Sequence, residues 1–165
     1  MDDLSTLHPV LEIVLGILAM IVIIFVHGVG LRAINQHFNR SWIHVNAATA
    51  HWRINLLLAF TIGSLAALHF VETLLWAVPV SLMGLIPSMR DSYYFVLEAY
   101  TTLGEGAVSL PDQWRLFGPI IAISGLFTFG WTGSVLVSIM TEVGKLDRVR
   151  AKKELRSEAA NIPSS

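Results

Sequence analysis

Residues 100–106 read Tyr-Thr-Thr-Leu-Gly-Glu-Gly, and just before them residues 93–97 read Tyr-Tyr-Phe-Val-Leu. An exposed loop has little use for so many apolar and aromatic side chains. Residues 91–101 predict a short helix with Ser88 or Asp91 as its N-cap. At 1.5 Å per residue this helix would be about 16 Å long, half the thickness of a hydrocarbon core. The glycines at its end predict an irregular backbone.

The chain around this segment is very apolar. It has 165 residues, of which 54% are hydrophobic and only 14% are charged, and its mean hydropathy is +0.63. A soluble domain with a water-facing surface is more polar than this. The apolar residues gather into three runs, each longer than or close to the roughly 20 residues that cross a bilayer, at 10–29, 54–86 and 114–140. We therefore expect an all-α membrane protein with three transmembrane helices.

The first run lies near the N-terminus, where a cleaved signal peptide is the alternative to a spanning helix. Asp2 and Asp3 stand where a signal peptide carries basic residues, and residues 15–26 continue without a small-residue cleavage site. We expect a retained transmembrane helix over residues 1–31.

The charges between the runs predict the orientation in the membrane. The first connection carries Arg32, Arg40 and Arg53 and no acid, whereas the second carries acids as well as arginines. The C-terminal segment is again rich in lysine and arginine. The positive-inside rule places the first connection and the C-terminus in the cytoplasm, and the N-terminus and residues 87–113 outside. Trp76 then falls near the outer surface, where it would belong to an aromatic belt.

A half-crossing helix followed by glycines indicates a pore, because non-helical backbone at membrane depth is tolerated only when it is buried in protein or lines a water-filled cavity. Gly104 and Gly106 can adopt positive φ at little cost, which lets successive carbonyls point to one side. Four such segments around an axis would stack rings of carbonyl oxygens that replace the hydration shell of K⁺ or Na⁺. One chain cannot surround an ion in this way, so we expect a homotetramer.

With this arrangement, the residues resemble the two-helix pore module of the bacterial ion channel family within the potassium-channel superfamily. The likeness covers roughly residues 54–143, in the order outer helix, pore helix, filter and inner helix, and the first helix lies outside it. The residues that carry it are His69-Phe70-Val71-Glu72 with Trp76, Tyr94-Phe95, residues 101–106, Trp114-Arg115-Leu116 and Phe129-Gly130-Trp131.

The resemblance implies a selectivity filter made of Thr101, Thr102, Leu103, Gly104, Glu105 and Gly106. It also implies that the Thr102 hydroxyl lies at the inner ion site of this filter. The family usually has an aromatic residue where Glu105 stands and an Asp where Ala107 stands. Non-selective members similarly carry an acid in place of the aromatic. We expect a channel that conducts potassium and other monovalent cations, with divalent cations binding or blocking at Glu105. The alternative is that Glu105 turns away, hydrogen-bonds behind the filter and leaves potassium selectivity intact.

The predicted organisation begins with an N-terminal transmembrane helix over residues 1–31 and a cytoplasmic loop, with room for an interfacial helix, over 32–53. The pore module over 54–143 and a cytoplasmic tail over 144–165 follow. Within the pore module we expect an outer helix over residues 54–86, a pore helix with its filter over 88–107, and an inner helix over 112–143. No cytoplasmic ligand-binding domain is expected after the tail.

His69 and Glu72 lie three residues apart in the second run, so they share a helix face, and ionisable residues inside a membrane are candidates for function. One interpretation is a structural hydrogen bond from this pair to the back of the pore helix or filter. The other is a direct role in gating or protonation. Two ligands on one helix are too few for a metal site without help from elsewhere.

Gly125, Gly130 and Gly133 belong to a face of small residues in the third run. Small residues let helices approach closely in lipid. We expect this face to pack closely against a neighbour, to bend as a gating hinge, or to do both.

Other functions find less support in the sequence. The chain has no cysteine, hence no disulfide or thiolate site, and its net charge of −1 offers no basic surface to nucleic acid. No Ser-His-Asp set, phosphate loop or metal motif indicates an enzyme, and no cofactor is expected beyond the permeant ions. The alternatives are a non-conducting scaffold or accessory subunit, and a membrane metal enzyme that uses His69 and Glu72. We expect an integral protein of a bacterial inner membrane.

Overall fold

The computed structural model describes residues 2–104 and 106–160, and within them the chain is helical with no strand. In chain order the helices are α1 (Asp2–Trp42), α2 (His51–Leu82), α3 (Met89–Tyr100), the 3₁₀ helix η1 (Asp112–Trp114) and α4 (Phe117–Ala160). Three helical segments are long and apolar enough to cross a membrane, and they lie in α1, in α2, and across η1 and α4. The prediction of an all-α protein with three such helices is confirmed.

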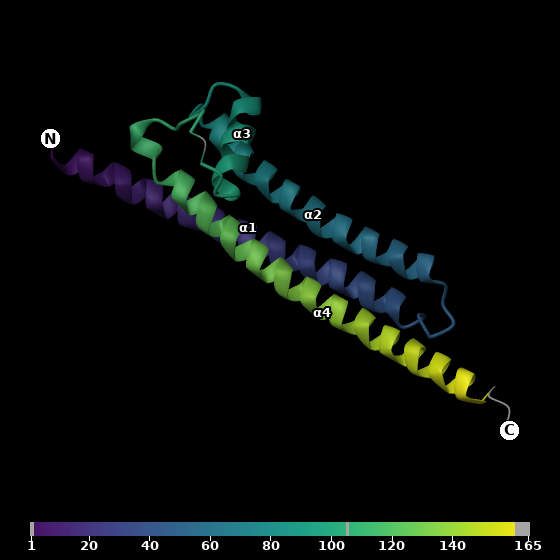
Figure 1. Ribbon diagram of the computed structural model, residues 1–165. Helices are drawn as coiled ribbons and strands as arrows, with labels where there is room; N and C mark the ends of the chain where they lie inside the picture. Colours follow the sequence, from purple (N-terminus) through teal and green to yellow (C-terminus); the bar gives the residue numbers. More distant parts are fainter. Residues whose placement is uncertain (1, 105, 161–165) are drawn as a thin grey trace.

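The three long helices run side by side in an elongated bundle (Figure 1). Helix α1 packs against both α2 and α4, and the short α3 packs against α2 and α4 at one end. The N-terminus lies at the same end as α3. The connection between α1 and α2 and the C-terminal part of α4 lie at the other end (Figure 1).

Each long helix buries one narrow stripe. In α1 the stripe contains Ile23, His27, Leu31 and Phe38, all at most 3% exposed. A spacing of three, four or seven residues keeps such positions on one face of a helix. Because the stripe continues past Arg32, the helix continues as well.

Residues 32–42 of the predicted cytoplasmic loop are therefore helical and continuous with α1. Helix α1 runs to Trp42 and α2 begins at His51, so the non-helical connection is 43–50. The physical reason is packing, since the ring of Phe38 is almost fully buried and stacks on Trp42 with the ring centres 5.3 Å apart.

Helix α3 begins and ends within two residues of the predicted helix. Ser88 is its N-cap, as one of the two alternatives had it, and its Oγ accepts from the backbone N–H of Asp91 at 3.4 Å. The buried face of α3 includes Val96 and Tyr100, which join the same apolar core as Val80 of α2.

Helix α4 differs from the predicted inner helix at both ends. Residues 112–114 form η1, α4 starts only at Phe117, and it continues through much of the expected tail to Ala160. The extension is held from outside the helix, because the Arg150 guanidinium donates to the backbone carbonyls of Asn46 and Thr49 in the α1–α2 connection.

Trp76 does not lie at a surface, which corrects the aromatic-belt prediction. Its side chain is fully buried between α2 and α4, and the indole N–H donates to Ser124 Oγ at 3.0 Å. A buried tryptophan normally finds a partner for this donor, and Ser124 supplies it.

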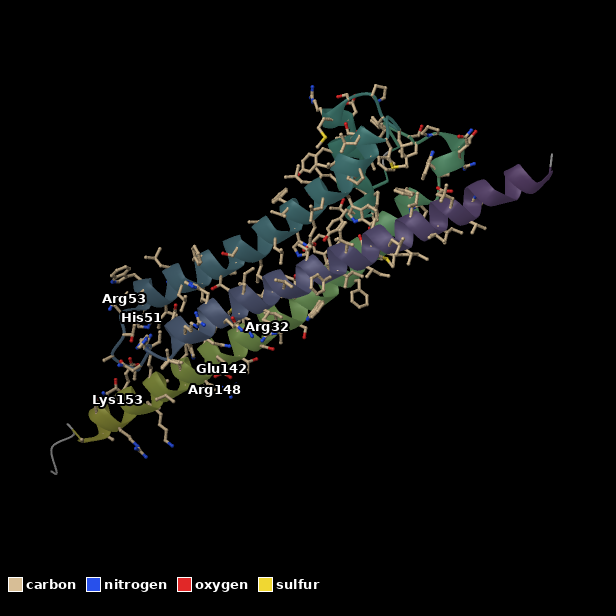
Figure 2. All side chains as sticks on the ribbon, turned by 180° about the vertical axis from the view of Figure 1, so that it is seen from behind. Arg32, His51, Arg53, Glu142, Arg148 and Lys153 are labelled. Atoms are coloured by element: carbon tan, nitrogen blue, oxygen red, sulfur yellow. The ribbon has the colours of Figure 1, made fainter. Side chains whose placement is uncertain are left out.

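Five charged residues and one histidine that Figure 2 labels lie in the half of the bundle away from α3. Figure 2 shows Arg32, His51, Arg53, Glu142, Arg148 and Lys153 there, on all three long helices. This is the end that the positive-inside rule assigns to the cytoplasm.

Candidate functional site

The segment after α3 has an unusual backbone. Thr102, Gly104 and Gly106 have φ angles of +59°, +64° and +72°. Positive φ at Gly104 and Gly106 was predicted from the sequence and is confirmed. Thr102 was not predicted, because a β-branched residue is rarely left-handed. Left-handed residues at positions 102, 104 and 106 break the alternation of carbonyl directions that a strand would have.

This backbone is fixed to the end of α3. The N–H of Thr102 donates to the carbonyl of Ala99 at 3.0 Å, and the N–H of Leu103 donates to the carbonyl of Glu98 at 2.9 Å. The Thr101 hydroxyl turns back and donates to the Leu97 carbonyl at 2.7 Å. The predictions made for Glu105 fall on a residue outside the described part of the chain.

The tip of α3 meets α4 at Gly125. A Cβ on Gly125 would overlap the carbonyl oxygen of Tyr100, so the close-packing interpretation of Gly125 is confirmed. Gly130 and Gly133 are different, because a Cβ at either position would have no described heavy atom within 4 Å. Of the three predicted small residues, the described chain packs closely only against Gly125.

A buried polar cluster lies at the same level. The Tyr100 hydroxyl donates to Glu72 Oε2 at 2.5 Å, and His69 Nδ1 lies 3.0 Å from the Tyr100 hydroxyl. The predicted hydrogen bonds from His69 and Glu72 to the pore-helix candidate are thus present, with Tyr100 as their partner. His69 Nδ1 is also 3.6 Å from Glu72 Oε2.

Helix α1 contributes a residue that the sequence reasoning missed. His27 is fully buried, and its Nδ1 lies 2.6 Å from Glu72 Oε1. Thr132 on α4 joins the two histidines, with Oγ1 3.3 Å from His27 Nε2 and 3.1 Å from His69 Nε2. The signal was in the sequence, because an ionisable residue inside an apolar run is a functional candidate by default.

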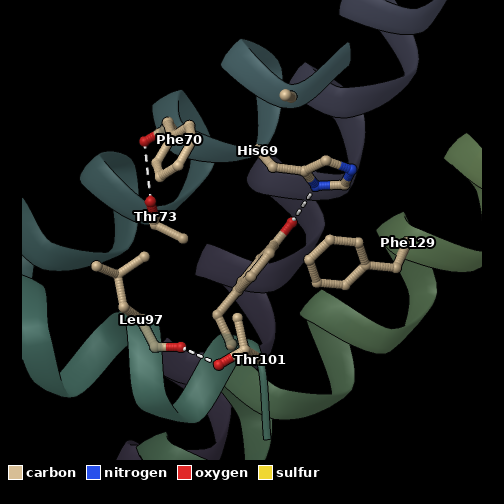
Figure 3. A pocket seen from close by; sticks show the side chains of 8 residues that line it. His69, Phe70, Thr73, Leu97, Thr101 and Phe129 are labelled. Carbon is tan, nitrogen blue, oxygen red and sulfur yellow. Dashed lines mark hydrogen bonds between the residues drawn. The ribbon is translucent and has the colours of Figure 1, made fainter. Parts of the chain in front are cut away.

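A cavity of about 240 Å³ opens beside this cluster. It has His69 and Phe129 on one side and Thr73 and Leu97 on the other (Figure 3). Thr101, the first residue after α3, also lines it. The cavity therefore connects the surroundings of His69 to the start of the glycine segment.

Two further buried carboxyl groups were missed. Glu12 is 4% exposed and accepts from the backbone N–H groups of Leu116 and Phe117 at the start of α4. A carboxylate is stabilised at a helix N-terminus, so Glu12 docks α1 onto α4. Glu98 on α3 is 5% exposed, and its Oε1 has no partner among the described residues.

The cluster surrounds the buried Glu72 carboxylate with groups that can compensate its charge. A carboxylate taken out of water is costly unless donors or an opposite charge compensate it. Glu72 is surrounded by one hydroxyl and two imidazoles, which supply those donors. Imidazole and carboxylate are also the side chains that bind zinc-class metal ions.

Comparisons with protein-family models, curated proteins and solved structures find no match for this chain. The resemblance to a pore module therefore rests on the quoted residues, and the function on the geometry of the site.

Proposed function

We propose that the chain is one subunit of a homotetrameric cation channel that passively conducts potassium and other monovalent cations. The observation that carries the proposal is the left-handed backbone at Thr102, Gly104 and Gly106, directly after a short helix. A backbone that turns successive carbonyls to one side is suited to replacing the hydration shell of an ion. The filter of the channel is then Thr101, Thr102, Leu103, Gly104, Glu105 and Gly106.

The left-handed residue Thr102 lies where α3 ends and the proposed filter begins. A non-glycine residue in the left-handed region costs roughly 1–2 kcal/mol, and such outliers cluster at active sites and ligand clamps. The same conformation also closes α3, because the N–H groups of Thr102 and Leu103 donate to the carbonyls of Ala99 and Glu98 in the pattern of a helix C-cap. In a filter, Thr102 adds a hydroxyl to the ring of carbonyls.

The position of α3 supports a pore helix that re-enters the membrane. Its last residue, Tyr100, lies beside Gly125, which is about 12 Å along α4 from Phe117 at 1.5 Å per residue. Helix α3 thus runs back between α2 and α4 instead of away from them. Its C-terminal dipole end, which is negative, precedes the filter and favours a cation there.

The polar cluster serves as the support of the filter in this proposal. Tyr100 ends the pore helix, and its hydroxyl is held by Glu72 at 2.5 Å and Thr128 at 2.5 Å. These two residues come from α2 and α4, so a shift of either helix would move the end of α3. We assign His69 and Glu72 to positioning the filter, and Gly130 and Gly133 to hinge motion of α4.

Glu105 sets the selectivity in this proposal. Four carboxylates around the axis attract cations, and an acid in place of a packed aromatic ring weakens the brace behind the filter. We therefore expect weak discrimination between potassium and sodium, and binding or block by divalent cations. The subunit sits in a bacterial inner membrane with its N-terminus outside and its C-terminus in the cytoplasm.

Flux through liposomes tests the proposal. Purified protein is reconstituted, and cation efflux is measured with potassium or sodium inside, for the wild type, Glu105→Tyr and Glu105→Gln. We expect comparable flux of both ions in the wild type and a shift toward potassium in Glu105→Tyr. Glu154→Gln, which removes an exposed acid of α4, is the matched control and should leave the ratio unchanged.

The oligomer is measured on the same preparation. Its mass should be about four times the 18.2 kDa of the chain. A tetramer without flux in the wild type and both Glu105 variants would leave the scaffold or accessory subunit as the function. A stable monomer would exclude a pore built from four filters.

A further inference from the structure

We propose that His27, His69 and Glu72 form a binding site for one transition-metal dication of the zinc class in each chain. One ligand atom from each residue lies within 4.8 Å of the others. Two ligands on α2 were too few for a metal site, and α1 supplies the third. The site is distinct from the filter, and the proposal does not depend on ion conduction.

The geometry is close to that of a metal site. Zinc bonds to nitrogen and oxygen are about 2.0–2.2 Å, so two ligand atoms in a tetrahedron lie about 3.3–3.6 Å apart. His69 Nδ1 and Glu72 Oε2 already have nearly this separation, at 3.6 Å. His27 Nδ1 lies 2.6 Å from the other oxygen of the same carboxylate, Oε1, and has to withdraw by about 0.7 Å from it if that oxygen also binds the ion.

The ligand chemistry selects the class of metal. Two imidazoles and one carboxylate suit Zn²⁺, Co²⁺, Ni²⁺ or Cu²⁺, whereas Ca²⁺ and Mg²⁺ prefer oxygen ligands and water. Magnesium binds through carboxylate oxygens and retained waters, whereas this cluster offers two imidazoles and a single carboxylate. The Tyr100 hydroxyl, next to both Glu72 and His69, is the oxygen best placed for a fourth ligand.

Surrounding groups already orient the ligands. Both histidines direct Nδ1 toward the Glu72 carboxylate and Nε2 toward the Thr132 hydroxyl. A second hydrogen bond of this kind fixes the ring of a metal-binding histidine. Thr128 holds the Tyr100 hydroxyl at 2.5 Å.

The cavity provides a path for the ion. His69 lines it and is 12% exposed at its side chain, whereas His27 and Glu72 behind it are not exposed. A metal that entered past His69 and Tyr100 would join α1 to α2 and meet the end of α3. Occupancy would therefore tie the first helix to the rest of the bundle.

Cobalt binding to the purified, tag-free protein in detergent tests the site. Co²⁺ should bind with one ion per chain and give the visible absorption of a four- or five-coordinate nitrogen and oxygen site, and Zn²⁺ should displace it. X-ray absorption of the Zn²⁺-loaded wild type should show about two imidazole ligands at about 2.0–2.1 Å. This measurement needs no variant.

Variants then assign the ligands. His27→Gln, His69→Gln and Glu72→Gln should each lower affinity for Co²⁺ by more than about 100-fold, and Thr132→Val by about 10- to 100-fold because it only orients the rings. His37→Gln is the control, since His37 is an exposed histidine of the same helix as His27. Retained secondary structure by circular dichroism is required of each variant.

Three results would overturn the proposal. They are the absence of Co²⁺ and Zn²⁺ binding by the folded wild type, a wild-type X-ray absorption spectrum without imidazole ligands, and an affinity that His27→Gln and Glu72→Gln leave at the wild-type value. None of them bears on ion flux, so a failure here is separate from a failure of the channel proposal.

Discussion

At the scale of single residues, two glycines of α4 show how the same amino acid can have different roles. Gly125 lies against the carbonyl of Tyr100, whereas no described atom would contact a Cβ at Gly130. Both were predicted from one face of small residues. Only the position of α3 separates them, because a pattern of small residues does not say which one a neighbour approaches.

Gly125→Ala should therefore be strongly destabilising and Gly130→Ala should not. The new methyl group would overlap backbone, which cannot rotate away as a side chain can, so we expect a loss of about 1–3 kcal/mol in the free energy of unfolding. Denaturant titration in detergent measures it. Equal stabilities of the two variants would contradict the contact between α3 and α4.

Trp76 gives a second prediction at this scale. Trp76→Phe leaves Ser124 without its indole partner and opens a gap in a fully packed place, so the free energy of unfolding should fall by about 1–3 kcal/mol. Trp52→Phe changes a side chain that is 62% exposed and is the control. Tryptophan fluorescence of each variant reports unfolding, and a neutral Trp76→Phe would be incompatible with the buried hydrogen bond.

At the scale of elements, the long helices extend beyond their apolar runs, and a tertiary contact holds part of the extension of α4. The C-terminal half of α4 is an example, since it is rich in charge and would be marginal alone. Arg150 is 8% exposed and reaches the carbonyls of Asn46 and Thr49. The connection between α1 and α2 is held in the same way.

Arg150→Ala should loosen that connection. Hydrogen bonds from a charged donor contribute about 1.5–3 kcal/mol, which corresponds to at least about tenfold in an opening equilibrium. We expect amide hydrogen exchange over residues 43–50 to accelerate by that factor. Arg148→Ala removes an exposed arginine two positions away and should leave exchange unchanged; equal effects of both variants would argue against the contact.

At the scale of the whole molecule, the two ends of the bundle differ in charge, and this difference predicts a topology. The chain contains no cysteine, so single cysteines can be introduced without background. Asp112→Cys, at a side chain that is 97% exposed, should react with an impermeant maleimide added to intact cells. Lys153→Cys should react only after the membrane is opened, and the reverse pattern would invert the orientation.

Much of the architecture could be read from the sequence. The three long apolar helices and the short helix, with Ser88 as one of its two candidate caps, follow from hydropathy and from local hydrogen bonding, which depend on residues close together in the chain. Positive φ at Gly104 and Gly106 also follows, because only the lack of a Cβ makes that backbone inexpensive. The ends of α1 and α4 did not follow, since Phe38 and Arg150 find their partners through packing.

The candidate site likewise has one part that the sequence determined and another that only the tertiary structure decided. By itself the sequence determined that His69 and Glu72 share a face of α2, because their spacing sets it. The tertiary structure alone decided that His27 of α1, Tyr100 of α3 and Thr132 of α4 meet this pair. Helix periodicity fixes which side chains of one helix point the same way, whereas the rotation and depth of separate helices are set only when their buried surfaces come together.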